Sequence, residues 1–362
     1  MNMKILVLFL SLSLLIGLFL GAKTNALPNP LALTVTTDKP SYRLQTISPS
    51  TINIGGNLTL NGAPVSGGLV AVTAFQGKTG HYVRPVLFRT LATGPIPPQN
   101  WNLNVSLTVL ALKGIQYVPQ TVFTRPSNQT SPGPAFNVTF KNTALYTLPR
   151  LYLTLTIFDA KKVPIAAINV TQTTQPIPPG LATSIIVPPT DLKEWVALGT
   201  ATVYATAFDN IPPYVYFPYC PEVSKTFTVV PSSGSAMLNQ GNLENPKQIF
   251  SSVNGNYNMA FNLSYSQAVP KYIPWGNYTV QVSSSYQGYQ AANSYTFWVR
   301  IWGDINGDTI VNIKDVTPIS LNWLKTVPPA PAYADLNGDG VINIKDVTPI
   351  SITWLCREQP LP

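Results

Sequence analysis

The sequence predicts a mainly β protein with two β-sandwich domains followed by a small tail of different construction. The pattern allows one of the two sandwiches to be discontinuous in sequence. Hydrophobic residues make up 45% of the chain and charged residues only 10%, whereas typical globular domains are about 25% charged. The apolar residues fall in short runs rich in Val, Ile, Thr and Tyr, separated by 35 Pro and 23 Gly, which is typical of strands and turns. The chain of 362 residues has room for two or three domains.

The first 26 residues read as a secretory signal. A short positive start (1–4) precedes an apolar run (5–21), and a segment that ends in small residues (22–26) follows. Cleavage is expected after Ala26. The apolar run is longer than the apolar region of a usual signal peptide, which has about 7–15 residues. The alternative that the segment is an uncleaved N-terminal membrane anchor therefore stays open. In either case we expect a secreted or cell-surface protein.

Export bears on two other features of the sequence. Seven N-x-S/T sequons are either glycosylation sites or the chance product of a sequence rich in Asn, Ser and Thr. They lie at Asn57, Asn104, Asn128, Asn137, Asn169, Asn262 and Asn277. The two cysteines, Cys220 and Cys356, could pair in an oxidising compartment or stay free, since the sequence does not supply their geometry.

The first and last β-rich segments are each too short for a sandwich. Alternating strands are predicted between residues 32 and 75, with Asn61-Gly62 as a tight turn, before a loop-rich stretch at 76–100. Only about three strands fit between residues 252 and 299.

These two segments are therefore expected to be parts of one domain. An unpaired sheet edge in each part would otherwise be a liability. Residues 32–99 would form the first part of the sandwich and 232–300 the second, with a second sandwich, 100–231, inserted between them. In the insertion, residues 159–162 are predicted to form a hairpin turn.

Both sandwiches resemble extracellular modules. The stretch from TTDKPSY to GNLTLNGAPVSGGLVAV resembles the opening strands of bacterial and archaeal Ig-like or macroglobulin-like adhesive domains. FNVTFKNTA and LTIFDAKKVPI are similar to the CARDB-type sandwich related to cell adhesion. The resemblance implies fold rather than function.

The tail contains an internal repeat. Segments that start at Gly303 and Ala334, 31 residues apart, share the nonapeptide NIKDVTPIS, so they are two copies of one unit. Each copy has oxygen-bearing side chains at positions 1, 3, 5, 9 and 12 of a 12-residue loop, and a backbone carbonyl at position 7. Ca²⁺ prefers six to eight oxygen ligands arranged in this way.

The repeat therefore predicts two calcium ions. The expected ligands are Asp304, Asn306, Asp308, Ile310, Asn312 and Asp315 in the first loop, and Asp335, Asn337, Asp339, Val341, Asn343 and Asp346 in the second. Position 6 requires a positive φ, which suits Gly340 but not the β-branched Thr309, so the first site is predicted to be weaker.

A short helix is expected after each loop. Thr317-Pro318 and Thr348-Pro349 read as N-cap and N1 residues. The apolar residues that follow are expected to form a small core between the helices. They are Ile319, Trp323 and Leu324 in the first repeat, and Ile350, Trp354 and Leu355 in the second.

The tail, residues 301–356, resembles a type I dockerin. The resemblance implies a partner of cohesin type, chosen in part by loop positions 10 and 11. These are Ile313-Lys314 and Ile344-Lys345, identical in the two copies, which implies docking in two orientations. Thr309 and the Pro early in each helix depart from the family pattern. The alternative that the two tandem loops simply cap the neighbouring sandwich stays open.

Composition argues against several classes of function. The net charge is +8, but the bases are scattered singly, so nucleic acid is not an expected partner. The single histidine, His81, and the few carboxylates outside the tail form no recognisable catalytic set, so neither catalysis nor a small-molecule substrate is expected.

The sequence thus predicts a non-catalytic protein attached through its tail, with the sandwiches as spacer or adhesive modules. The alternative is a carbohydrate-binding accessory component of a polysaccharide-degrading assembly. Its aromatic platform would consist of Trp101, Trp195, Trp275 and Tyr289.

Overall fold

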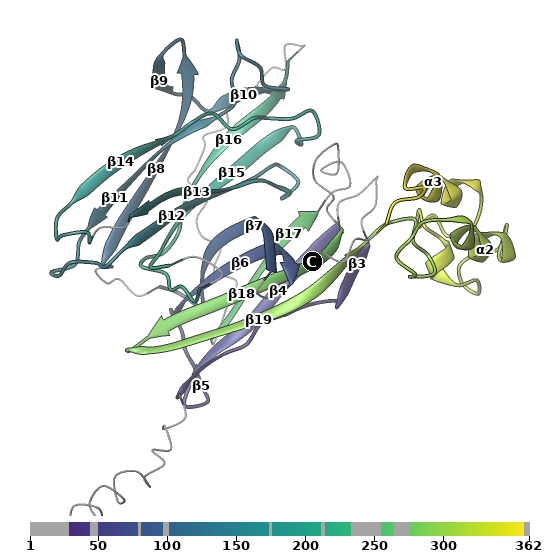
Figure 1. Ribbon diagram of the computed structural model, residues 1–362, viewed down its shortest axis with the longest axis horizontal. Helices are drawn as coiled ribbons and strands as arrows, with labels where there is room; N and C mark the ends of the chain where they lie inside the picture. The colour runs from purple at the N-terminus through teal and green to yellow at the C-terminus, as the bar shows by residue number, and fades with distance from the viewer. Residues whose placement is uncertain are drawn as a thin grey trace, which may run out of the picture.

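The computed structural model describes residues 29–43, 50–78, 81–96, 101–173, 176–210, 214–232, 255–263 and 275–357. In this part the chain forms four β-sheets and two short α-helices (Figure 1). The predicted signal, residues 1–26, lies outside the described residues. None of the described helices is long and apolar enough to cross a membrane.

The first sheet combines strands from both ends of the β-rich region. Its long central strand, β4, pairs with β17 so that Ile52 lies opposite Phe261. The predicted turn at Asn61 and Gly62 follows β4, and both residues have the positive φ that a tight hairpin turn needs (51° and 80°). The strands are β1 (Leu31–Leu33), β2 (Thr36–Thr37), β4 (Ser50–Leu60), β5 (Ala63–Pro64) and β17 (Asn256–Leu263).

The second sheet faces the first across an apolar core and has the order β3-β19-β18-β6-β7. Val282 of β18 lies opposite Val72 of β6. Strand pairing thus joins residues of the first expected part (32–99) to residues of the second (232–300). The strands are β3 (Ser41–Arg43), β6 (Leu69–Lys78), β7 (His81–Ala92), β18 (Gly276–Tyr286) and β19 (Tyr289–Arg300).

Strand β7 lies where a loop-rich stretch was predicted, so that prediction was wrong. The register of β7 against β6 shifts beside Pro85, which breaks the period-2 pattern that would identify a strand. A proline is tolerated there because β7 is an edge strand of its sheet. The edge is nevertheless well packed, with Leu87 and Phe88 buried.

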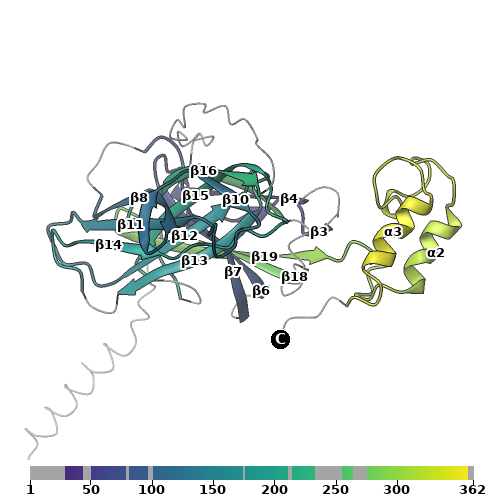
Figure 2. The ribbon, with the colours of Figure 1, turned by 90° about the horizontal axis from the view of Figure 1, so that it is seen from above.

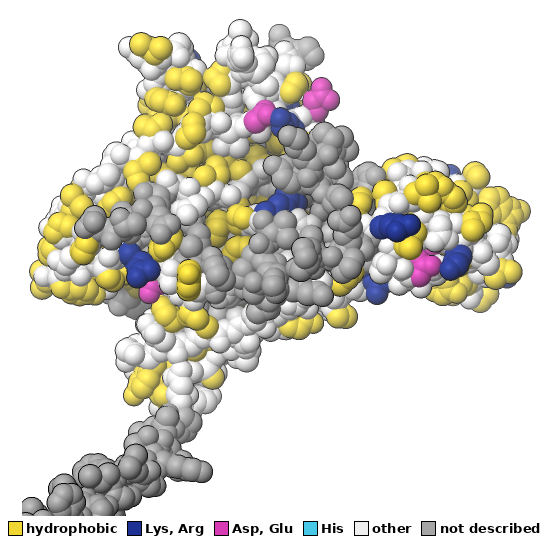
Figure 3. All heavy atoms as spheres, in the orientation of Figure 1, with side chains coloured by type: hydrophobic (Ala, Val, Ile, Leu, Met, Phe, Trp, Pro, Cys, Tyr) yellow, Lys and Arg dark blue, Asp and Glu magenta, His cyan; other side chains and the backbone are white. Residues whose placement is uncertain are grey.

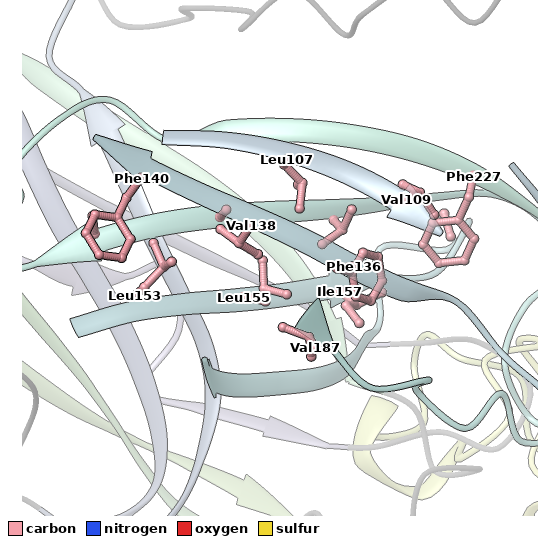
Figure 4. Close-up of a cluster of buried hydrophobic side chains, with 14 of the residues drawn as sticks. Leu107, Val109, Phe136, Val138, Phe140, Leu153, Leu155, Ile157, Val187 and Phe227 are labelled. Atoms are coloured by element: carbon pink, nitrogen blue, oxygen red, sulfur yellow. The ribbon is translucent and has the colours of Figure 1, made fainter. Parts of the chain in front are cut away.

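The inserted segment forms the other two sheets, whose facing side chains make a separate core (Figure 4). One sheet has the order β10-β16-β15-β12-β13 and the other β14-β11-β8-β9. The hairpin turn predicted at 159–162 joins β12 to β13, and the Asp159 carboxylate accepts hydrogen bonds from the backbone N–H groups of Lys161 and Val163. The strands are β8 (Leu103–Lys113), β9 (Gln116–Pro119), β10 (Val122–Arg125), β11 (Ala135–Asn142), β12 (Leu151–Phe158), β13 (Pro164–Thr173), β14 (Ala182–Val187), β15 (Gly199–Phe208) and β16 (Val223–Pro231).

The two sandwiches pack against each other through their inner sheets. Phe75 and Phe88 of the first sandwich share an apolar cluster with Tyr152, Phe208 and Tyr216 of the insertion. Every residue of β12 is buried, so this strand is covered on both faces.

Polar contacts also cross the same boundary. The Thr156 hydroxyl accepts a hydrogen bond from the Phe88 N–H (2.8 Å) and donates one to the Phe88 carbonyl (3.0 Å). The Tyr216 hydroxyl bonds to Thr73 and to the carbonyl of Gln281. The boundary therefore combines apolar contact with hydrogen bonds of the Thr156 and Tyr216 hydroxyls.

A buried ion pair joins the sandwiches at one place. The Arg89 guanidinium of β7 makes two hydrogen bonds to the carboxylate of Glu222, at 2.8 and 2.5 Å. It also stacks over the ring of Tyr204, 3.5 Å from the centroid. Burial is the largest single cause and acts to lower the Arg89 pKa. The charge and hydrogen bonds of Glu222, together with Tyr204, outweigh it, so the Arg89 pKa is raised. Both side chains of the pair are almost fully shielded from water.

Removing one charge of this pair should destabilise the protein. We expect Glu222→Gln to lower the free energy of unfolding by about 3 kcal/mol or more, because Arg89 is then buried without a counter-charge. Urea denaturation measures the change. Lys193→Gln, which breaks an exposed ion pair with Asp191, is the control and should cost less than about 1 kcal/mol. Equal effects of the two substitutions would contradict the prediction.

Candidate functional site

The tail continues directly from strand β19. The two residues after β19, Ile301 and Trp302, are buried, and the first loop begins at Asp304. Figure 2 shows the tail at one end of the molecule, with its two helices side by side. The helical elements are α2 (Ile313–Leu321), the 3-10 turn η2 (Ala332–Ala334) and α3 (Ile344–Ile352).

The first loop wraps around two buried carboxylates. The Asp304 carboxylate accepts hydrogen bonds from the N–H groups of Gly307 (2.8 Å) and Thr309 (3.1 Å). The Asp315 carboxylate accepts from the N–H groups of Ile305, Asn306 and Asn312. Both carboxylates are thus held by backbone N–H groups of the loop itself.

In the first loop, contacts also join position 3 to position 5 and position 9 to position 7. The amide Nδ2 of Asn306 lies 3.2 Å from Oδ2 of Asp308. The amide Nδ2 of Asn312 lies 3.3 Å from the carbonyl oxygen of Ile310. All six expected ligand residues therefore belong to one compact loop.

The second loop repeats this geometry. The Asp335 carboxylate accepts from the N–H groups of Gly338 (2.8 Å) and Gly340 (2.9 Å). The Asp346 carboxylate accepts from the N–H groups of Asn337 and Asn343. The amide Nδ2 of Asn337 lies 3.3 Å from Oδ2 of Asp339, and the amide Nδ2 of Asn343 lies 3.1 Å from the carbonyl oxygen of Val341.

The charges of the first loop repel one another. Burial is the main cause that raises the pKa of Asp304, and the negative charges of Asp315 and Asp308 raise it further. Each loop thus holds three carboxylates together with amide and backbone oxygens. Such a set of hard oxygen donors, half of them anionic, fits a divalent hard cation such as Ca²⁺.

The ligand set depends on more than charged side chains. In the described part of the chain, no three side chains of the types His, Cys, Asp and Glu are grouped closely enough to hold a metal ion on their own. The proposed set therefore includes the asparagine oxygens and the position 7 carbonyl as well as the three carboxylates.

The helices begin earlier than predicted. Asn312 and Asn343 are the N-caps: each side chain accepts from the N–H of the second residue of its helix (Lys314 or Lys345), and each forms a capping box with Asp315 or Asp346. The expectation that each helix starts at its Thr-Pro pair was wrong. The spacing of Asn and Asp, three residues apart, is the sequence signal that identifies this start.

The expected core between the helices is only partly correct. Ile319 and Ile350 are buried there. The other four members are on the surface, because the chain turns with positive φ at Leu324 and Leu355. The exposed fractions are 43% for Trp323, 69% for Leu324, 45% for Trp354 and 66% for Leu355.

The predicted partner-binding residues are also exposed, at equivalent places in the two repeats. Ile313 and Ile344 are exposed to 68% and 67%. The amino groups of Lys314 and Lys345 lie 3.8 and 3.1 Å from the carboxylates of Asp308 and Asp339. Figure 3 shows apolar side chains interspersed with basic ones on this tail.

The predicted aromatic platform for carbohydrate is not assembled. Trp101 and Trp195 pack against the core of the inserted sandwich, while Trp275 is buried at the base of the tail. Tyr289, at the start of β19, is the one exposed member of the four. The two cysteines are free thiols: Cys220 is buried in the inserted sandwich, which raises its pKa to about 12, and Cys356 packs in the tail.

Comparison with known proteins identifies the tail. Residues 302–350 match the family model described as dockerin type I domain, so the chain carries a type I dockerin domain at its C-terminus. No curated protein matches the sequence. A crystal structure of dimeric latent PorU from Porphyromonas gingivalis aligns with 12% identity and a TM-score of 0.19 over 75% of this chain and 34% of that one. The chain thus spans about a third of the length of that structure, and so low a TM-score supports no inference.

The two loops should differ in local stability at position 6. Thr309 has a φ of 72° and Gly340 a φ of 85°, and this conformation costs a non-glycine residue about 1 kcal/mol. In chelator, Thr309→Gly should slow amide hydrogen exchange in residues 304–315 by about fivefold. Gly340→Thr is the matched reverse change and should accelerate exchange in the second loop. Unchanged exchange in both variants would rule out strain at this position.

Proposed function

We propose that this is an exported, non-catalytic protein that attaches to a cohesin-like partner through its calcium-loaded dockerin domain. The observation that carries the proposal is the duplicated loop, in which matching oxygens, caps and exposed side chains recur in both repeats. Calcium, when bound, would neutralise the crowded carboxylates and hold the loops in the geometry described above. Three Asp in each loop supply most of the charge.

The docking surface in this proposal has two equivalent halves. Ile313 and Lys314 start α2, and Ile344 and Lys345 start α3. Further exposed apolar side chains near the helix ends enlarge each half, with Leu321 in the first repeat and Ile352 in the second. A partner that binds one half can bind the other after a rotation of the tail, because the two halves carry matching residues.

The remaining modules are assigned by the same proposal. Residues 32–99 and 232–300 are an Ig-like sandwich into which the CARDB-like sandwich 100–231 is inserted, and both act as spacer or adhesive modules. Residues 301–356 are the docking unit. The signal at residues 1–26 supports export. The alternative of a carbohydrate-binding accessory has less support, because Trp275 is buried and Trp101 and Trp195 are partly buried against an apolar core.

Calcium binding can be tested one loop at a time. Wild-type protein should bind two ions in isothermal titration calorimetry, the first loop more weakly because of Thr309. Asp308→Ala and Asp339→Ala each remove one exposed position 5 ligand, and each should abolish one of the two binding events. Absence of calcium binding at millimolar concentration in the wild-type protein would refute the proposal.

Docking can be tested with substitutions in one half or both. We expect Ile313→Asp with Lys314→Glu, or Ile344→Asp with Lys345→Glu, to leave calcium-dependent retention on immobilised cohesin modules nearly intact. The four substitutions together should abolish it. Ile115→Asp, at an exposed isoleucine of the inserted sandwich, is the control. If the fourfold variant is still retained, the partner binds elsewhere; if no cohesin retains the wild type, the proposed partner is wrong.

A further inference from the structure

Residues of the first sandwich contact the tail beside its first loop. Trp275, which precedes β18, is 8% exposed and belongs to the same apolar cluster as Ile305, Val311 and Ile319 of the tail. Its indole Nε1 donates a hydrogen bond to the backbone carbonyl of Arg357 (3.2 Å). The sandwich thus holds the last described segment of the chain.

That last segment is paired with the first loop. The N–H of Val311 donates to the Cys356 carbonyl (3.0 Å), and the N–H of Leu355 donates to the Val311 carbonyl (2.9 Å). Ile310 and Arg357 are bridge partners. Ile310 occupies position 7, whose carbonyl is a proposed calcium ligand. Trp275 therefore supports position 7 through one intervening strand segment.

Trp275 is itself fixed by the sandwich. Its backbone carbonyl accepts from the side-chain amide of Gln76 (3.3 Å), and the oxygen of that amide accepts from Nε of Arg84 (2.8 Å). A second contact reaches position 1: the Arg43 guanidinium donates to the Asp304 carbonyl at 3.3 Å. Strands β3, β6 and β7 therefore all contribute to the support of the first loop.

The second loop is supported differently. Its residues 340–342 pair with residues 324–327, which belong to the tail itself: the Leu324 N–H donates to the Ile342 carbonyl, and the Val327 N–H to the Gly340 carbonyl. Thus the second loop has an internal pairing partner where the first uses a segment held by the sandwich. The first loop is also the one with the unfavourable Thr309.

We propose that Trp275 is a positioning residue for the first calcium site, so that the sandwich completes this site through Trp275 while the second site does not depend on that residue. The inference rests on the proposed binding of calcium to both loops. Because linkage is reciprocal, calcium in the first loop also strengthens the contact between tail and sandwich. Contacts from the sandwich offset part of the strain at Thr309.

The neutral residue Trp275 allows a cleaner test than the arginines. A Cβ on Gly307 would lie 2.9 Å from the guanidinium of Arg300, and Arg300 is the register partner of Arg43. Both cations thus lie near the first loop. Replacing either arginine would have two opposite effects on calcium affinity. The lost contact would weaken calcium binding, whereas the lost repulsion between arginine and calcium would strengthen it. Trp275→Phe removes the N–H donor and keeps an aromatic ring.

The experiment measures calcium affinity by calorimetry in full-length protein with one loop disabled. With Asp339→Ala, which leaves the first loop, Trp275→Phe should weaken binding roughly threefold to tenfold, the value of one hydrogen bond. With Asp308→Ala, which leaves the second loop, it should change affinity less than twofold. Truncation after Leu355 should have the same selective effect. Trp101→Phe, in the other sandwich, is the control and should alter neither site.

Three outcomes would overturn the inference. One is an unchanged first-loop affinity in both Trp275→Phe and the truncated chain. Another is an equal loss at both loops, which would show a general structural role for Trp275. The third is an absence of calcium binding by the wild-type chain, which would refute the proposed function and the inference with it; normal binding of two ions with no selective effect would refute the inference alone.

Discussion

The ladder between β6 and β18 connects parts of the chain that are far apart in sequence. The Thr279 hydroxyl on β18 bonds to the Gly77 carbonyl, 202 residues away, and the two strands form the centre of a sheet whose outer strands are β3 and β7. Closing so long a loop is costly in chain entropy, but the cost grows only logarithmically with its length. An insertion that folds on its own core holds its two ends in place, which makes this pairing possible. The tail follows β19, so its position also depends on this sheet.

The contact between the sandwiches is mixed in composition. It carries threonine, serine and alanine alongside aromatic rings, and the buried Thr156 and Tyr216 hydroxyls have partners on the opposite sheet. Small side chains let two sheets approach closely, and paired hydroxyls avoid the cost of buried unsatisfied polar groups. The Arg89–Glu222 pair also restricts how the two sandwiches can be oriented, because a desolvated bidentate pair tolerates little displacement. The interface thus defines one arrangement of the two sandwiches.

Sequence pattern predicted the parts of this structure that depend on local periodicity. The alternation in β12 and β18, the turns at Asn61-Gly62 and Asp159–Lys162, and the doubled loop could all be read from short segments. Strand β7 was missed because Pro85 and a register shift hide its alternation. The surface positions of Trp323 and Trp354 were missed because a helical face that continues past the helix end predicts burial, whereas the positive φ of Leu324 and Leu355 turns the chain away. No local pattern links Arg43, Gln76 or Trp275 to the tail, since only tertiary pairing brings them there.

The absence of a flexible connection gives the tail a defined direction. Ile301 and Trp302 are buried, and the Trp302 indole donates to the carbonyl of Leu336 in the second loop (3.0 Å). Gly303 passes so close to α3 that a Cβ there would lie 3.0 Å from the Cα of Ile350. In the proposed docking, a tail held in this way transmits its orientation to the body of the protein. Docking through one half of the tail or the other would then point the sandwiches in two different directions from the same partner, so the pseudo-symmetry of the tail would become a choice between two geometries of the whole assembly.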